Sequence, residues 1–334
     1  MQYRSFADMN QTILRHRNLL PGTIDLVVGI PRSGLVAANF LSLAINSPLT
    51  DLAGLIEGRI FEAGSTKRTP NFEQANAKDR VVVVIDDTIG SGRAFQAARR
   101  RIQEAKIPGK FIYCAIYGEF SRYEGVDHIF EVIGSPALCE WNVMHDRSIL
   151  KSALVDFDTV LCQETHTNCA LGNAHSIRSL DQSKPNHTPT RSIGTVVTSR
   201  PSAQKKCVER WLKEHGIEYN RLVLCPSQDL NLPAHVHKSK TYGSSDAVIF
   251  IGGGQKECSE IAQSTGKPVL SMEKQEIISP GLNLRSMSQS AKMVPIYCRN
   301  GWGGLAQGNL AVLKHRLRLA LGERAYATLK SIFK

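Results

Sequence analysis

Short apolar runs alternate with helical patterns in the first half of the chain. The run Val81–Ile85 contains only β-forming residues and predicts a parallel strand buried on both faces. The helix predicted after it, over 94–105, has apolar positions three to four residues apart, namely Phe95, Ala98, Ile102 and Ala105. A similar unit covers Ile24–Ala38, where an apolar run leads through a Gly/Pro/Arg/Ser turn into an apolar helix. Repeated units of this kind favour an α/β fold with a parallel sheet.

The second half repeats the alternation with its own strands and helices. After Trp141–Lys151, the apolar run Ala153–Cys162 predicts a new strand, and Leu180–Arg191 is rich enough in Ser, Pro and His to predict an exposed loop. Further strands are predicted at Thr195–Val197, Arg221–Cys225, Ala247–Ile251 and Pro268–Ser271, with helices over 203–215 and 257–265. We therefore expect a two-domain α/β protein in which each domain holds a parallel sheet.

Composition is that of an ordinary soluble chain. The chain has 334 residues, which is long enough for two separate cores. Its residues are 42% hydrophobic and 21% charged. No window is apolar enough to span a bilayer, and Met1–Asn10 lacks a signal-peptide pattern, so a cytoplasmic protein is expected. The eight cysteines form no C-x-x-C pair and are expected to be reduced core thiols.

Positive charge is concentrated in the second half. Of the formal net charge of +11, the first 152 residues carry +2 and the remaining 182 carry +9. Such an excess attracts nucleic acid, an anionic glycan or an acidic membrane, or it aids solubility. Because clustered aromatic residues are absent from the sequence, nucleic-acid recognition is disfavoured.

Candidate chemistry begins where the first buried run ends. Asp86 and Asp87 follow that run directly, and the small-residue turn Thr88–Ala94 leads into the helix. Two adjacent carboxylates are costly to bury together, so both are expected to face a ligand or solvent. Gly90 lets the backbone approach an anion, and the next three amides can point at a phosphate beside the helix N-terminus, those of Ser91, Gly92 and Arg93.

This segment resembles the motif with which type I phosphoribosyltransferases bind 5-phosphoribosyl 1-diphosphate (PRPP). The resemblance implies that Asp86 and Asp87 hold the ribose 2- and 3-hydroxyls and that Thr88–Ala94 cradles the 5-phosphate. Purine-salvage members of the family usually carry an acidic residue where this chain has Gly90. That departure argues against an ordinary purine acceptor.

The earlier unit resembles the pyrophosphate loop of the same family. The residues that would face the leaving diphosphate are Gly29, Arg32, Ser33 and Gly34. Arg32 supplies bidentate donors to phosphate oxygens. The resemblance implies that Mg²⁺ bridges diphosphate and ribose, and it places this metal at Asp86 and Asp87.

The polar segment Glu57–Arg80 lies between the two motifs and is either a flap over PRPP or a solvated basic loop. As a flap it would contact phosphate or acceptor through Arg59, Lys67 and Arg68. A hydroxyl acceptor also needs a general base. The candidates are Glu57, Glu140 and Asp146, each of which is otherwise an ordinary ion-pair residue.

The second half resembles a haloacid-dehalogenase-like (HAD-like) phosphatase. Asp156 and Asp158 match its D-x-D pair of nucleophile and general acid/base, which would also bind Mg²⁺. The phosphoryl-binding hydroxyl would be that of Thr198 or Ser199, and the charge-neutralising lysine would be Lys238 or Lys240. The strand end at 250–254 lacks the metal-binding acid of the family, and the nearest one is Glu257. Two interpretations of this domain therefore remain: an active phosphatase, and a domain that keeps the fold without the activity.

The whole chain resembles a fusion of these two families. We expect a phosphoribosyltransferase domain at 1–150, a HAD-like domain at 151–304 and a basic amphipathic helix at 305–334. Such fusions are associated with ribofuranose in bacterial polysaccharides, which implies transfer to a sugar hydroxyl, with the 5-phosphate removed by the second domain or by a separate phosphatase. A nucleobase-like acceptor and a PRPP-sensing regulator are the alternatives, and a homodimer is expected by analogy with the resembled fold.

Overall fold

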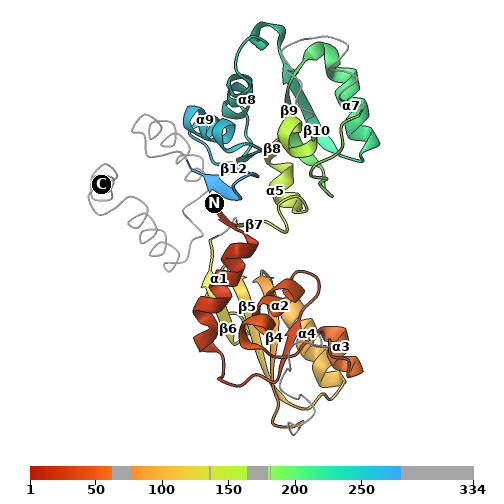
Figure 1. The fold of residues 1–334 in the computed structure, drawn as a ribbon, viewed down its shortest axis with the longest axis vertical. Coiled ribbons are helices and arrows are strands. Elements are labelled where there is room, and N and C mark those ends of the chain that lie inside the picture. The colour runs from red at the N-terminus through yellow and green to blue at the C-terminus, as the bar shows by residue number, and fades with distance from the viewer. Residues whose placement is uncertain (62–76, 135–136, 164–179, 181, 280–334) are drawn as a thin grey trace, which may run out of the picture. The chain divides into compact units, whose positions relative to one another are not determined.

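The computed structural model describes residues 1–61, 77–134, 137–163, 180 and 182–279. Within them, two mainly parallel sheets carry helices on both faces (Figure 1). The α/β class expected for each half is therefore confirmed. The helix expected over 305–334 lies outside the described residues.

The first sheet has five parallel strands in the order β3-β2-β4-β5-β6. These strands are β2 (Leu26–Gly29), β3 (Leu49–Asp51), β4 (Val81–Ile89), β5 (Lys110–Gly118) and β6 (His128–Val132). The strand order reverses direction at β2 and β4, whose carboxyl ends meet at one edge. In open α/β sheets this edge is where ligands bind.

Helices cover the first sheet on both faces. The first face packs against α1 (Phe6–His16) and α2 (Gly34–Ile45), with Met9, Ile13 and Leu41 fully buried. The opposite face packs against α3 (Leu52–Glu57) and α4 (Arg93–Glu104). Of the apolar positions predicted for α4, Phe95, Ala98 and Ile102 are buried, whereas Ala105 caps the helix and is exposed.

Strand β4 is longer than the apolar run from which it was predicted. It continues through both aspartates to Ile89, because β5 keeps pairing with it as far as Ile89 and Gly118. The aspartates are therefore part of the strand and do not form the start of a turn. A small two-stranded sheet, absent from the sequence prediction, pairs β1 (Gln2–Arg4) with β7 (Ala137–Cys139) in parallel.

The second sheet has the order β10-β9-β8-β11-β12-β13. Its first five strands are parallel, and β13 is an antiparallel edge strand that the sequence did not predict. The strands are β8 (Ala153–Asp156), β9 (Ile193–Pro201), β10 (Tyr219–Cys225), β11 (Ile249–Gly252), β12 (Val269–Ser271) and β13 (Glu276–Ile278). One face packs against α5 (Arg147–Lys151) and α7 (Lys205–Glu214), and the other against α8 (Ala234–Gly243) and α9 (Gln255–Thr265).

Two expectations for the second half need correction. The strand predicted over 153–162 ends at Asp156, where the Asp156 side chain accepts a hydrogen bond from the Asp158 amide and a π-helical turn, Phe157–Leu161, begins. The loop expected to be exposed at Leu180–Arg191 is exposed only in part, because Leu180 and Ser183 are buried.

The remaining expectations concern cysteines and membranes. The six cysteines in the described residues are all free, and five of them are buried, which agrees with reduced core thiols. No helix among the described residues is both long and apolar enough to cross a bilayer.

Candidate functional site

Asp86 and Asp87 lie near the carboxyl end of β4 and are more buried than the sequence predicted. The two residues are 8% and 2% exposed, so neither carboxylate faces solvent as the sequence allowed, and the ligand-facing alternative stays a prediction. Asp87 accepts hydrogen bonds from Ser33 Oγ at 2.8 Å and from Trp141 Nε1 at 2.5 Å. These partners compensate the burial of its charge.

Asp86 is buried with less compensation. Its Oδ1 accepts a hydrogen bond from the Asp87 amide at 2.9 Å. Burial and the neighbouring Asp87 carboxylate raise its pKa from 3.8 to about 9. Gly34 at the start of α2 packs against this residue, since a Cβ at Gly34 would lie 2.6 Å from Asp86 Oδ1. The two sequence motifs are thus in direct contact.

The turn after β4 exposes backbone donors beside a helix. Gly90, Ser91 and Arg93 are exposed, whereas Thr88 is half-buried. Gly92 has φ +74°, a conformation that favours glycine, and α4 begins at the next residue. The amides of this first turn have no partner within the helix, which gives the turn the properties of an anion-binding site.

Arg32 lies in the neighbouring turn between β2 and α2. Its side chain is exposed and donates a hydrogen bond from Nη2 to Asn142 Oδ1 at 3.1 Å. The peptide bond between Pro31 and Arg32 is cis. Ser33 and Gly34 follow in the same turn and contact the aspartates, so the described structure brings together the two loops that the sequence singled out.

Comparison with known families identifies this part of the chain. Residues 3–147 match the family described as "Phosphoribosyl transferase domain". The N-terminal part is a type I phosphoribosyltransferase domain. The match covers less than half of the chain and ends before β8, and no curated protein sequence matches the chain.

Solved structures resemble the chain only distantly. Xanthine-guanine-hypoxanthine phosphoribosyltransferase of Helicobacter pylori is 13% identical, with a TM-score of 0.29, over 42% of this chain and 92% of that one. Adenine phosphoribosyltransferase of Saccharomyces cerevisiae is 17% identical, with a TM-score of 0.25, over 39% and 77%. A hypothetical protein of Neisseria gonorrhoeae with bound ppGpp is 14% identical, with a TM-score of 0.30, over 42% and 89%.

The other residues predicted for the phosphoribosyltransferase domain are dispersed. Arg59 forms ion pairs with Asp51 and Glu57, and Glu57 is exposed. Glu140 accepts a hydrogen bond from the Phe6 amide, so its carboxylate stabilises the start of α1. The predicted flap contacts Lys67 and Arg68 lie outside the described residues.

Asp146 caps a helix. Its Oδ1 accepts hydrogen bonds from the amides of Ser148 and Ile149 at the start of α5. Burial alone would raise its pKa, but these hydrogen bonds outweigh that effect and lower it. The carboxylate thus has a structural role in addition to any role in a site.

Trp141 and Asn142 contact the two motifs, although the sequence did not predict either as a site residue. Trp141 bonds to Asp87 and stacks on Tyr117, with ring centroids 6.5 Å apart, while Asn142 bonds to Arg32. No local pattern pairs a tryptophan with an aspartate 54 positions away. The local sequence marks Trp141 only as a single tryptophan between two polar residues, Glu140 and Asn142.

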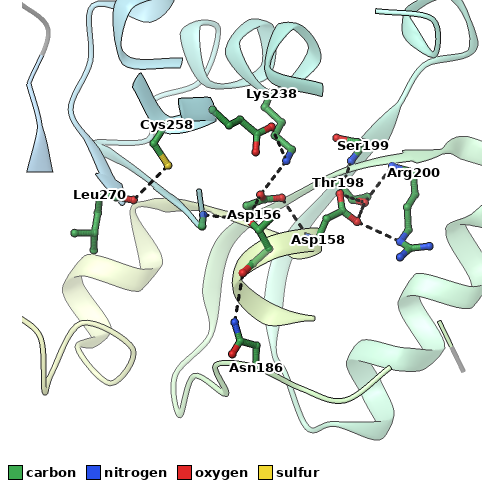
Figure 2. Close-up of polar contacts among 12 residues, drawn as sticks. Asp156, Asp158, Asn186, Thr198, Ser199, Arg200, Lys238, Cys258 and Leu270 are labelled. Atoms are coloured by element: carbon green, nitrogen blue, oxygen red, sulfur yellow. Dashed lines mark hydrogen bonds and ion pairs between the residues drawn. The ribbon is translucent and has the colours of Figure 1, made fainter. Parts of the chain in front are cut away.

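A second group of charged residues lies at the carboxyl end of β8 (Figure 2). Asp156 is fully buried and accepts a hydrogen bond from Lys238 Nζ at 2.9 Å. Lys238 is 2% exposed and forms a second ion pair with Glu257, also at 2.9 Å. Burial opposes the charge on Lys238, but the two carboxylates outweigh it and raise its pKa. For Asp156 the effect of burial prevails over Lys238 and raises the pKa to about 6.

Asp158 has its own set of donors. Thr198 Oγ1 and the Ser199 amide donate to its carboxylate at 2.9 and 2.8 Å, and Arg200 Nε donates at 3.2 Å (Figure 2). Arg200 and Asp158 are both nearly fully buried. The sequence did not predict Arg200, although it follows the two predicted hydroxyl residues directly.

Of the two lysines proposed for this group, only Lys238 belongs to it. Lys240 forms an ion pair with Asp229, and its side chain is 58% exposed. Both lie on α8, and residues two positions apart on a helix point in different directions. The alternative Lys240 is therefore wrong as a neighbour of Asp156.

The end of β11 leaves no room for an added carboxylate. The hydroxyl of Thr159 donates to Asp156 and accepts a hydrogen bond from the Gly253 amide at 3.0 Å. A Cβ at Gly253 would lie 2.5 Å from Thr159 Cβ. In the described part of the chain, no group of three His, Cys, Asp or Glu side chains is placed to hold a metal ion.

Proposed function

We propose that this protein transfers 5-phosphoribose from PRPP to an acceptor and releases diphosphate. The observation that carries the proposal is the meeting of two loops at one sheet edge. Asp86 and Asp87 lie near the carboxyl end of β4 beside the turn of Ser33 and Gly34, and the amides at the start of α4 follow within a few residues.

Each group has a distinct role in this reaction. Asp86 and Asp87 accept hydrogen bonds from the ribose 2- and 3-hydroxyls, and Thr88–Ala94 holds the 5-phosphate with backbone amides. Arg32 and its turn hold the diphosphate. Displacement at C1 builds positive charge on the ribose and negative charge on the leaving group, so donors and cations around the diphosphate lower the barrier.

The two carboxylates of β4 fit a magnesium ion. They are adjacent and buried, and the described side-chain donors to Asp87 are neutral. The raised pKa of Asp86 indicates that no nearby cation stabilises its charged form. Mg²⁺ binds through one or two carboxylates together with substrate phosphates. When bound, the ion neutralises charge on the diphosphate.

The acceptor is a sugar hydroxyl of a bacterial glycan that contains ribofuranose. Two sequence features support this choice: Gly90 lacks the acid of purine-salvage enzymes, and the fusion resembles proteins of polysaccharide ribofuranosylation. A nucleobase-like heterocycle is the second candidate acceptor. A PRPP-sensing regulator without turnover is the alternative to an enzyme.

The second domain keeps a HAD-like arrangement without magnesium-dependent phosphatase activity. The matched residues Asp156, Asp158, Thr198 and Lys238 do converge, which supports the family resemblance. The residues do not fit the metal, because Lys238 and Arg200 already neutralise the carboxylates and Thr159 fills the space beside Gly253. The 5-phosphate is then removed by a separate phosphatase.

The test of the transferase is diphosphate release from PRPP and Mg²⁺ with candidate acceptors, including neutral glycosides, orotate, purines and nicotinamide. We expect release that depends on a glycoside and is lost in Asp87→Asn, with Glu104→Gln at the exposed end of α4 as the matched control. Release with orotate, a purine or nicotinamide would contradict the glycan acceptor. PRPP binding without release under any condition would favour the regulator.

The second domain is tested with the 5-phosphorylated product or ribose 5-phosphate. We expect no phosphate release with or without Mg²⁺. Release that disappears in Asp156→Asn would overturn the assignment of a retained fold.

A further inference from the structure

A cavity of about 220 Å³ opens beside the end of β4, next to the turn proposed to hold PRPP. Its walls come from the ends of β4 and β5 and from the segment between β7 and α5. Its described lining includes Thr88, Gly90, Glu119, Asn142 and Asp146. Thr88 and Gly90 belong to the turn proposed to hold PRPP, so the cavity adjoins the proposed donor site and is the candidate space for the acceptor.

The described lining carries negative charge and no positive charge. Glu119 and Asp146 are its two carboxylates, and none of the described lining residues is Lys, Arg or His. Asp146 Oδ1 is engaged by the amides of α5. An anionic acceptor entering this cavity would meet two carboxylates and no cation among the described lining residues, which is unfavourable at a partly desolvated site. Arg32, which is bonded to the lining residue Asn142, is already assigned to the diphosphate.

Glu119 is held beside Gly90 by a tyrosine. Tyr123 accepts hydrogen bonds at its hydroxyl from the amides of Glu119 and Phe120, at 3.0 and 3.2 Å, and donates to Ile89 O at 3.2 Å. Ile89 and Gly118 are register partners at the ends of β4 and β5. Glu119 and Gly90 are therefore the next residues along two adjacent parallel strands, at the edge where ligands bind.

The side of Gly90 is empty. Nothing lies within 4 Å of a Cβ built at Gly90, so an acidic side chain would fit there but is absent. The acidic residue at this part of the cavity is Glu119, which directly follows β5, whereas Gly90 directly follows β4. The sequence did not single out Glu119, because only the pairing of β4 with β5 brings this residue beside Gly90.

From this placement we infer that the acceptor is uncharged or cationic and that Glu119 accepts its proton. The inference rests on the proposed transfer from PRPP. In the step, an acceptor oxygen or nitrogen forms a bond to C1, the bond from C1 to the diphosphate oxygen breaks, the electron pair leaves with diphosphate, and the acceptor proton passes to the Glu119 carboxylate. A positioned general base of this kind contributes roughly 10²- to 10⁴-fold in rate.

The first experiment uses water as the acceptor, since PRPP hydrolysis needs no knowledge of the natural one. Diphosphate release from PRPP and Mg²⁺ is measured for the wild type, Glu119→Gln and the matched control Glu124→Gln, an exposed glutamate on the same loop that does not line the cavity. We expect a loss of at least about 10-fold in Glu119→Gln, with PRPP affinity unchanged, and no loss in the control. Gly90→Asp in the Glu119→Gln background should restore part of the rate, because the open space admits the new carboxylate.

The second experiment measures acceptor charge with a pair matched in size, a neutral hexoside against the corresponding uronate. The neutral member should stimulate diphosphate release more, and Glu119→Lys should reverse the order. A uronate preferred by the wild type would overturn the inference, as would equal hydrolysis in Glu119→Gln and the wild type. Failure to bind PRPP, or binding with no diphosphate release, would instead overturn the proposed transferase itself.

Discussion

The chain carries two pairs of aspartates at the carboxyl ends of parallel strands, and their surroundings differ in charge. The pair on β4 receives hydrogen bonds from Ser33 and Trp141, which are neutral donors. The pair at β8 is bonded to Lys238 and Arg200, which are buried cations. Similar local sequences, an apolar run followed by acids, thus produce opposite electrostatic states.

The difference indicates which pair is built to receive a charged ligand. A buried carboxylate without a cation is unstable as an anion, and the pKa of Asp86 rises accordingly. A metal or a cationic ligand relieves that instability on binding. A carboxylate that is already paired with a buried cation of the protein gains little from a second cation. The β8 pair therefore contributes to the fold and is not expected to bind a metal ion or a cationic ligand.

The largest expected effect is on catalysis. Asp87→Asn should lower kcat/KM for PRPP by roughly 100-fold or more, because hydrogen bonds between a charged group and the ribose hydroxyls are lost. Asp158→Asn, the same substitution in the other pair, should leave kcat/KM within about 2-fold. Steady-state diphosphate release checks both variants. Equal losses in the two variants would remove the distinction between the pairs.

The next effect is on stability. Lys238→Met should lower the free energy of unfolding by about 3–5 kcal/mol, because it leaves Asp156 buried and without its cation. Lys240→Met on the same helix removes only a half-exposed ion pair and should cost at most about 1 kcal/mol. Chemical denaturation measures both, and Asp156→Asn added to Lys238→Met should recover part of the loss. A similar midpoint for the two lysine variants would show that the buried pair is not compensated as described.

The sequence predicted the parts of the scaffold whose signals are local. Apolar runs located β2, β4, β8, β9, β10, β11 and β12, and helical spacing located α2, α4, α7 and α9. It did not predict β3, β5 and β6 of the first sheet, nor β13, an edge strand of three residues whose pairing with β12 depends on the tertiary fold. The extension of β4 through two aspartates also depends on β5, so propensity alone ended the strand too early.

For the site, residues within a motif were predictable and residues that meet it from afar were not. Ser33, Gly34, Asp86 and Asp87 were chosen from two loops and do converge. Trp141, Arg200 and Glu119 were missed, because each reaches its neighbour through strand order or a distant segment. Lys238 could be separated from Lys240 only by the direction of each side chain from α8.

A smaller effect concerns pH. Asp86 keeps its proton to about pH 9 in the folded chain, whereas its ordinary pKa is 3.8, so between these values the folded state binds more protons than the unfolded state. The free energy of unfolding therefore falls as pH rises, by at most about 1.4 kcal/mol per pH unit from this group. Asp86→Asn removes this contribution, and its stability should exceed that of the wild type by an increasing margin from pH 6 to pH 8. Denaturation curves with parallel pH profiles for the two proteins would contradict the raised pKa.

The smallest expected effect comes from converting the second pair toward the first. Gly253→Asp alone should destabilise the fold, because the new Cβ would lie 2.5 Å from Thr159 Cβ. Combined with Thr159→Gly, which removes that contact, the aspartate would add a third carboxylate beside Asp156 and Asp158.

A magnesium concentration ten times the dissociation constant should then raise the free energy of unfolding of the double variant by about 1.4 kcal/mol and leave the wild type unchanged at this site. Thermal unfolding of the Asp87→Asn background with and without Mg²⁺ isolates the second domain from the first. If wild-type residues at 159 and 253 gave the same magnesium-dependent shift in that background, Lys238 and Arg200 would not be satisfying the β8 pair, and the contrast between the two pairs would fail.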